Sequence, residues 1–226
     1  VDSSAASDVY KRQGLVGGMG LGIAMISFIY SITNTTAAIT LLCLAAMPFF
    51  TALLAFLFLK EKISLNVWIS MLIATVGIII MAVGNTEKNS LIGFVFGLTS
   101  SIGFSIFSVT LRWRKETPKF TTVAVAGLFC FITATIMILV NKQPFFATSY
   151  NSAMFSLHGV LVCLGLILYS IGSKAIQAAE LTLLSLTEVI GGIFWVWLPL
   201  FGINEIPSTN TIAVSYTHLR AHETAQ

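Results

Sequence analysis

Charged residues are scarce in this 226-residue sequence, since Asp, Glu, Lys and Arg together make up 9% of it. An ordinary soluble domain holds about a quarter, so this scarcity argues against a soluble enzyme. The net charge of only +3 gives no reason to expect nucleic-acid binding. Hydrophobic residues make up 56% of the chain and the mean hydropathy is +0.91. These values exclude a disordered chain and predict that lipid surrounds most of the surface.

Motifs for catalysis, metals and cofactors are also missing. The three cysteines (Cys43, Cys130 and Cys163) lie singly in separate apolar runs, a pattern that suggests neither a disulfide framework nor a metal site. The glycine-rich stretch GLVGGMGLG at 14–22 contains no G-x-G-x-x-G. The sequence shows no Ser/His/Asp set and no P-loop. We therefore expect no enzyme, no metal and no cofactor.

What the sequence has in abundance is long apolar runs. Crossing the hydrocarbon core takes about 20 apolar residues in a helix, and the runs are continuous rather than alternating, unlike β-barrel strands. They predict an all-α, polytopic membrane helix bundle with seven transmembrane helices, at 14–33, 36–59, 65–84, 91–112, 120–141, 153–174 and 180–201.

Basic residues gather in alternate loops. The loops at 60–64, 112–119 and 174–179 carry seven Lys and Arg, whereas the intervening loops carry only Lys88 and Lys142. Because cytoplasmic loops are enriched in Lys and Arg, we expect the first group to be cytoplasmic. This makes the chain a multi-pass protein of the inner (plasma) membrane.

The chain also repeats itself at an offset of 142 residues. Residues 37–44 read AAITLLCL and residues 179–186 read AELTLLSL. The runs that contain them, 36–59 and 180–201, cross the membrane in opposite directions under the loop-charge topology. An inverted-topology repeat is the architecture of many secondary transporters.

These residues resemble the EamA-type family of drug/metabolite transporters. The stretch 36–84 resembles the end of that family's first repeat, with Pro48 in mid-helix, the run FFTALLAFLFL, Glu61 in the turn and a helix bearing Gly77. The stretch 179–208 resembles its second repeat, although Val189 stands where the family typically has proline.

The resemblance implies a ten-helix inverted-repeat fold. Residues 14–84 would be part of the first repeat (helices 3–5) and residues 91–213 part of the second (helices 6–9). It also implies alternating access, with export of a small metabolite or drug. The alternative is a non-transporting membrane protein: an enzyme, a channel or a structural bundle. The expected partners are the lipid bilayer and a small-molecule substrate. A homodimer is also possible.

The two ends differ from the rest in being polar. Residues 1–13 and 214–226 resemble translated sequencing-adaptor sequence, and we interpret residues 14–213 as an insert truncated at both ends. We expect both tails to pack little against the bundle.

Glu188 is the sharpest candidate for a substrate or proton site, because a charge in mid-membrane costs several kcal/mol. The alternative is a structural carboxyl that bonds to a neighbouring hydroxyl, and Ser185 and Thr187 are close in sequence. Trp195 could line a cavity, or it could belong to an interfacial aromatic belt. His158 could relay protons, or it could be an interfacial hydrogen-bonding group.

Two stripes of small residues complete the candidates. Gly97, Ser101, Ser105 and Ser108 share one helix face, and Gly14, Gly18 and Gly22 share another. Such stripes let helices approach closely. We expect that role here, and Ser101 and Ser105 could also hydrate a transport pathway.

Overall fold

The computed structural model describes residues 3–60, 65, 69, 88–113, 119–146, 148–175, 181 and 191. Every regular element in these residues is a helix, which confirms the all-α class. The elements are α1 (Ser3–Asn34), α2 (Ala37–Leu44), α3 (Met47–Leu54), the π-helical η1 (Ala55–Leu59), α5 (Lys88–Trp113), α6 (Lys119–Val140) and α7 (Ser149–Gly172).

Five segments within the described residues are long and apolar enough to cross a membrane. They are Gln13–Asn34, Ile39–Leu59, Leu91–Trp113, Phe120–Val140 and Ser149–Gly172. Each coincides with one of the seven expected runs. The other two runs, 65–84 and 180–201, lie outside the described residues apart from residues 65, 69, 181 and 191, so the count of seven stays a prediction.

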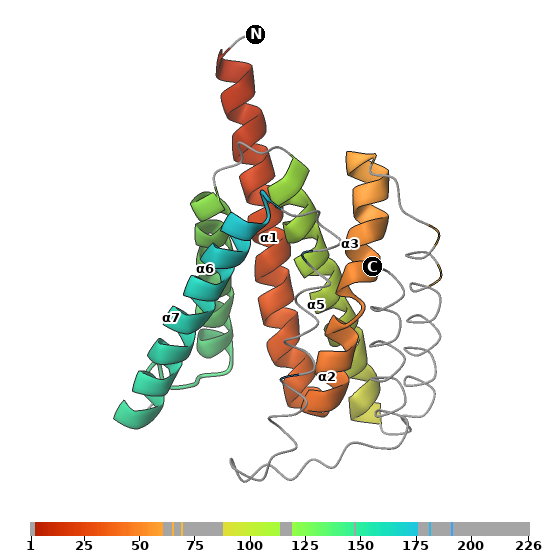
Figure 1. The fold of residues 1–226 in the computed structure, drawn as a ribbon. Coiled ribbons are helices and arrows are strands. Elements are labelled where there is room, and N and C mark those ends of the chain that lie inside the picture. Colours follow the sequence, from red (N-terminus) through yellow and green to blue (C-terminus); the bar gives the residue numbers. More distant parts are fainter. Residues whose placement is uncertain are drawn as a thin grey trace.

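Helices α1 and α5 form the centre of the described bundle (Figure 1). Their backbones cross at Gly20 and Gly103, where a Cβ on Gly103 would lie 2.6 Å from the Gly20 carbonyl oxygen. Helices α2 and α3 pack on α5, and α6 packs on α1. The largest fully buried side chain is Phe107 of α5, which clusters with Leu21 of α1. Glycine at the crossing therefore sets how closely the two central helices approach.

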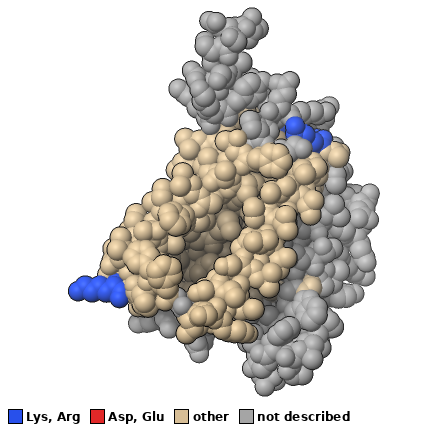
Figure 2. All heavy atoms as spheres, turned by 90° about the vertical axis from the view of Figure 1, so that its left-hand side faces the viewer, with Lys and Arg blue, Asp and Glu red and all other residues tan. Residues whose placement is uncertain are grey.

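Helices α6 and α7 lie at the edge of this arrangement (Figure 1). Only 6% of the residues in each of their spans are buried, against 44–56% in the other three spans. The face that they form is hollowed near its middle and has no charge over most of its described area (Figure 2). Apolar side chains exposed on this scale are typical of a lipid-facing surface.

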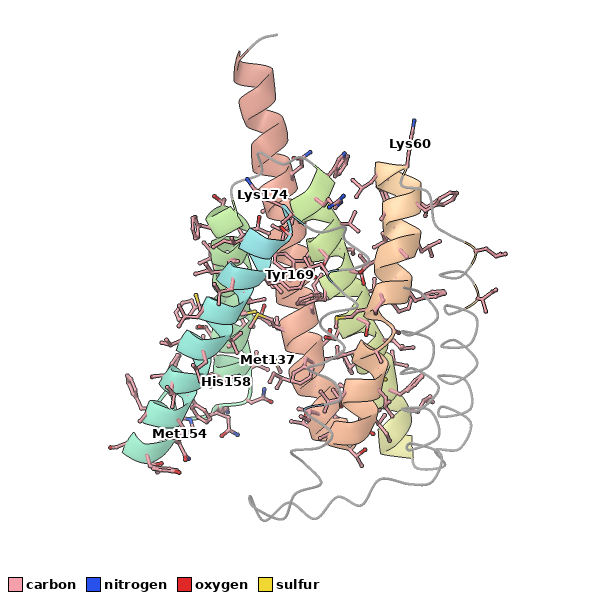
Figure 3. All side chains as sticks on the ribbon, viewed as in Figure 1. Lys60, Met137, Met154, His158, Tyr169 and Lys174 are labelled. Atoms are coloured by element: carbon pink, nitrogen blue, oxygen red, sulfur yellow. The ribbon has the colours of Figure 1, made fainter. Side chains whose placement is uncertain are left out.

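The described basic side chains lie at two opposite ends of the bundle. Helices η1, α5 and α7 all finish at the upper end of the bundle in Figure 1, and Lys60 and Lys174 lie there in Figure 3. Arg112 is in the last turn of α5, at the same end. The α6–α7 connection, which holds Lys142, lies at the opposite end. The first residues of α1 project past the upper end (Figure 1), and the expectation about the two tails stays a prediction.

Candidate functional site

Four of the predicted site residues lie outside the described residues: Ser185, Thr187, Glu188 and Trp195. Their proposed roles, and the pairing of 180–201 with 36–59, stay predictions. The structure does place Ser101, Ser105 and His158.

The span Ile39–Leu59 is broken near its middle. Helix α2 ends at Leu44, residues 45 and 46 form a turn, and α3 starts at Met47 with Pro48 in its first turn. Proline has no N–H, so Pro48 cannot donate to the carbonyl four residues earlier. The Ala46 N–H instead donates to the Cys43 carbonyl over 3.1 Å, in a tighter turn. The Leu44 carbonyl therefore lacks the donor that a residue with an N–H at position 48 would supply in a continuous helix.

Two serines of α5 bind the carbonyls on either side of this break. The Ser101 hydroxyl lies 2.6 Å from the Cys43 carbonyl oxygen, and the Ser105 hydroxyl lies 3.1 Å from the Met47 carbonyl oxygen. Each hydroxyl also lies within bonding distance of the carbonyl four residues earlier on α5, at 3.1 and 2.7 Å. Both serines are completely buried. Ser101 and Ser105 thus supply donors to the interrupted helix, and they do so from the stripe that the sequence predicts as a packing face.

The two helical stretches run parallel in a constant register. Cys43 meets Ser101 and Met47 meets Ser105, so each pair is separated by 58 residues. The same separation holds for Thr35 and Gly93, where a Cβ on the glycine would lie 2.7 Å from the threonine Cβ. The repeat of four residues on both helices keeps small side chains of α5 opposite the broken span.

Threonine hydroxyls behave differently along this span. The Thr40 hydroxyl pairs with Ser31 of α1 over 2.9 Å, and both residues are fully buried. The Thr51 Oγ1 atom is also buried, yet it has no hydrogen-bond partner in the described part of the chain. An unsatisfied buried hydroxyl costs about 1–3 kcal/mol. Thr51 is the buried hydroxyl on this span that the described residues leave without a partner, and the sequence analysis did not single it out.

The second predicted stripe is a contact face for α6. A Cβ at Gly18 would lie 2.6 Å from Val125, and a Cβ at Gly22 would lie 2.6 Å from Phe129. Gly14, one turn earlier, faces Thr121 at an ordinary 3.6 Å. The expected role of this stripe in close helix packing is therefore confirmed.

An aromatic cluster joins α5 to the end of α7. The Tyr169 hydroxyl lies 2.7 Å from Ser108 Oγ, and its ring stacks on Phe107 with centroids 5.9 Å apart. Phe104 meets the same ring edge-on at 5.1 Å. Figure 3 shows Tyr169 turned toward the bundle. Sequence reasoning missed Tyr169, because a tyrosine within an apolar run gives no sign of its partner on a distant helix.

His158 lies in the part of α7 where side chains are exposed (Figure 3). No hydrogen bond within the described residues joins it to Ser101 or Ser105, which are buried against the broken span. The structure therefore brings the two serines together and leaves the histidine apart from them.

The described interior carries hydroxyls and carbonyls rather than charges. The charged side chains described are Lys60, Arg112, Lys142 and Lys174, and all four lie at or beyond helix ends. Within the described residues no group of three or more His, Cys, Asp or Glu could hold a metal ion. Here the membrane-spanning core can offer a solute neutral hydrogen-bonding groups and apolar contact.

Comparison with known proteins agrees with this architecture. Residues 5–83 match the EamA-like transporter family. Proteins from two strains of Helicobacter pylori, each called an uncharacterized transporter, are 28% identical over 130 residues, covering 58% of this chain and 44% of each relative. A Clostridium kluyveri protein with the same description is 24% identical over 162 residues, covering 68% of this chain and 50% of its own.

One solved crystal structure of a protein superposes with a TM-score of 0.67 and 16% identity, over 94% of this chain and 75% of that one. At this identity the likeness shows the shared fold. The chain spans about half the length of the curated relatives it matches. This multi-pass membrane chain is therefore similar, over residues 5–83, to the EamA-like transporter family, and its listed relatives are named as transporters.

Proposed function

We propose that this protein is a secondary transporter that exports a small metabolite or drug across the inner membrane by alternating access. The observation that carries the proposal is the broken span Ile39–Leu59, which lies inside the segment matched to the family. Transporter folds commonly build solute sites from discontinuous helices whose free backbone groups line a cavity.

The chemistry of the described interior supports a solute that is largely apolar with a few hydrogen-bonding groups. Ser101 and Ser105 occupy the carbonyls at the break, while the Thr51 hydroxyl has no described partner. In this proposal Glu188 supplies the ionisable group that binds a proton or a cationic part of the solute. Ser185, Thr187 and Trp195, which lie near Glu188 in the sequence, are the other candidates for this part of the site.

The distribution of basic residues supports an orientation. Lys60, Arg112 and Lys174 share one end of the bundle, and Lys142 lies at the other. We assign the first end to the cytoplasm, because Lys and Arg favour cytoplasmic loops. Externally added maleimide that labels a cysteine at position 142 and spares one at position 60 supports this orientation, and the reverse pattern contradicts it.

Transport itself is tested with the full-length protein in proteoliposomes on a solid-supported membrane. The probes are the twenty amino acids, a set of nucleosides and the cation ethidium, each applied across a pH gradient. We expect at least one probe class to give a saturable current that Glu188→Gln abolishes without loss of folding. Currents equal to those of protein-free vesicles for every probe contradict transport of these solutes. Normal pH-dependent currents in Glu188→Gln remove the carboxyl from the coupling step.

A further inference from the structure

The end of the bundle where η1 and α5 finish combines an aromatic pair with basic side chains. Phe58 of η1 and Trp113 of α5 have ring centroids 6.2 Å apart. Their side chains are 56% and 46% exposed. Lys60 follows Phe58 by two residues, and Arg112 directly precedes Trp113. The ring contact therefore brings the two aromatic rings into one surface patch, and a basic residue lies next to or near each ring in the sequence.

Lys60 is directed outward by the way its helix ends. Its backbone adopts the left-handed conformation, with φ at 55°, and its N–H donates to the Ala55 carbonyl, which terminates η1. The side chain extends beyond the end of the helix in Figure 3. It is exposed, and within the described residues no carboxylate pairs with it. Its side chain is thus exposed at the surrounding interface.

The charge of the adjoining sequence has the same sign. The stretches 60–64 and 112–119 together contain six basic and two acidic residues. Four to eight Lys and Arg directly beside a membrane span are typical of segments that bind anionic lipid headgroups. Tryptophan and other aromatic rings favour the headgroup level of the bilayer.

We propose that Lys60, Arg112, Phe58 and Trp113 form a binding site for an anionic phospholipid. The two cations bind the headgroup phosphate, and the aromatic pair packs against the first carbons of the acyl chains. A lipid fits better than a free phosphate, because the patch continues into the exposed apolar side chains Phe56 and Leu57. The site needs only that the chain is embedded in a membrane, and it is independent of transport.

Lys142 provides a matched control for Lys60. It is also an exposed lysine with a left-handed backbone, φ 51°, but it lies at the opposite end of the bundle. Lys60→Gln and Lys142→Gln therefore remove the same charge from the same backbone conformation. Circular dichroism of the two purified variants shows whether each keeps the helical fold.

The test is native mass spectrometry of the full chain in detergent, titrated with phosphatidylglycerol or phosphatidylcholine. A basic residue near the surface contributes about 1 kcal/mol to binding an anionic lipid, or about fivefold in affinity. We expect Lys60→Gln to lower phosphatidylglycerol affinity about fivefold, Lys142→Gln to leave it unchanged, and neither to affect phosphatidylcholine. Equal losses in both variants, or none in Lys60→Gln, overturn the site. Displacement of the lipid by millimolar inorganic phosphate overturns the assignment to lipid.

Discussion

Replacing Gly103 by alanine inserts a methyl group where α1 and α5 approach most closely. The new Cβ would lie 2.6 Å from the Gly20 carbonyl oxygen, 3.0 Å from the Ala24 nitrogen and 3.2 Å from its Cα. Ordinary contact begins at 3.4 Å, so relief of the closest contact takes a shift of about 0.8 Å in the helix backbone. No side chain can absorb this shift by changing rotamer, because all three atoms belong to the backbone of α1.

The energy follows from how much packing that separation removes. A gap of about 0.5–1 Å loses a quarter to a half of each dispersion contact along the interface, and overpacked positions cost about 1–3 kcal/mol. Alanine also favours the helix over glycine by about 0.5–1 kcal/mol. We therefore expect a net loss of about 1–2 kcal/mol in the free energy of unfolding.

Gly127 in α6 is the matched control, because a Cβ there meets nothing within 4 Å. Gly127→Ala keeps the helix-propensity gain and adds no clash, so its free energy of unfolding is expected to be unchanged or slightly higher. Both variants are measured by circular dichroism during unfolding in mixed detergent with increasing SDS. If Gly103→Ala proves as stable as Gly127→Ala, the close crossing of α1 and α5 is wrong.

Three further substitutions probe the hydrogen bonds by the same unfolding assay. Thr51→Val removes a buried hydroxyl that has no described partner, so stability stays constant or rises by up to about 1 kcal/mol; a marked loss contradicts an unused hydroxyl. Ser101→Ala removes the donor to the Cys43 carbonyl and is expected to cost about 0.6 kcal/mol, the average for such bonds in membranes; an unchanged midpoint argues against the bond. Tyr169→Phe keeps the rings but loses the bond to Ser108, and its loss of about 1 kcal/mol should vanish in a Ser108→Ala background.

The extent of each described span could be predicted because hydropathy alone determines it. The expected run 91–112 corresponds to Leu91–Trp113, and the run 120–141 corresponds to Phe120–Val140. The small-residue stripes were also predictable, since a spacing of four residues places them on one helix face whatever the partner is. Gly18 and Gly22 show this, because both face α6.

The partners within the bundle could not be predicted in the same way. That Ser101 bonds the Cys43 carbonyl depends on the register between two helices, and periodicity within one helix carries no information on it. Pro48 predicts a bend just before itself, since the bond that it cannot make would reach the Leu44 carbonyl. It does not predict that Ser101 of α5 bonds the Cys43 carbonyl at this turn. The partner of Tyr169 could not be predicted for the same reason, since its bond to Ser108 joins residues 61 positions apart on different helices.

Counterflow through the full-length protein tests the proposed transport most directly. Proteoliposomes are preloaded with the unlabelled form of the probe that gives the largest current, and entry of its labelled form is followed without a pH gradient. Alternating access predicts that internal probe accelerates entry of the label, because a carrier returns loaded. Entry at the same rate from empty and preloaded vesicles contradicts that mechanism, and it favours a channel if entry exceeds that of protein-free vesicles.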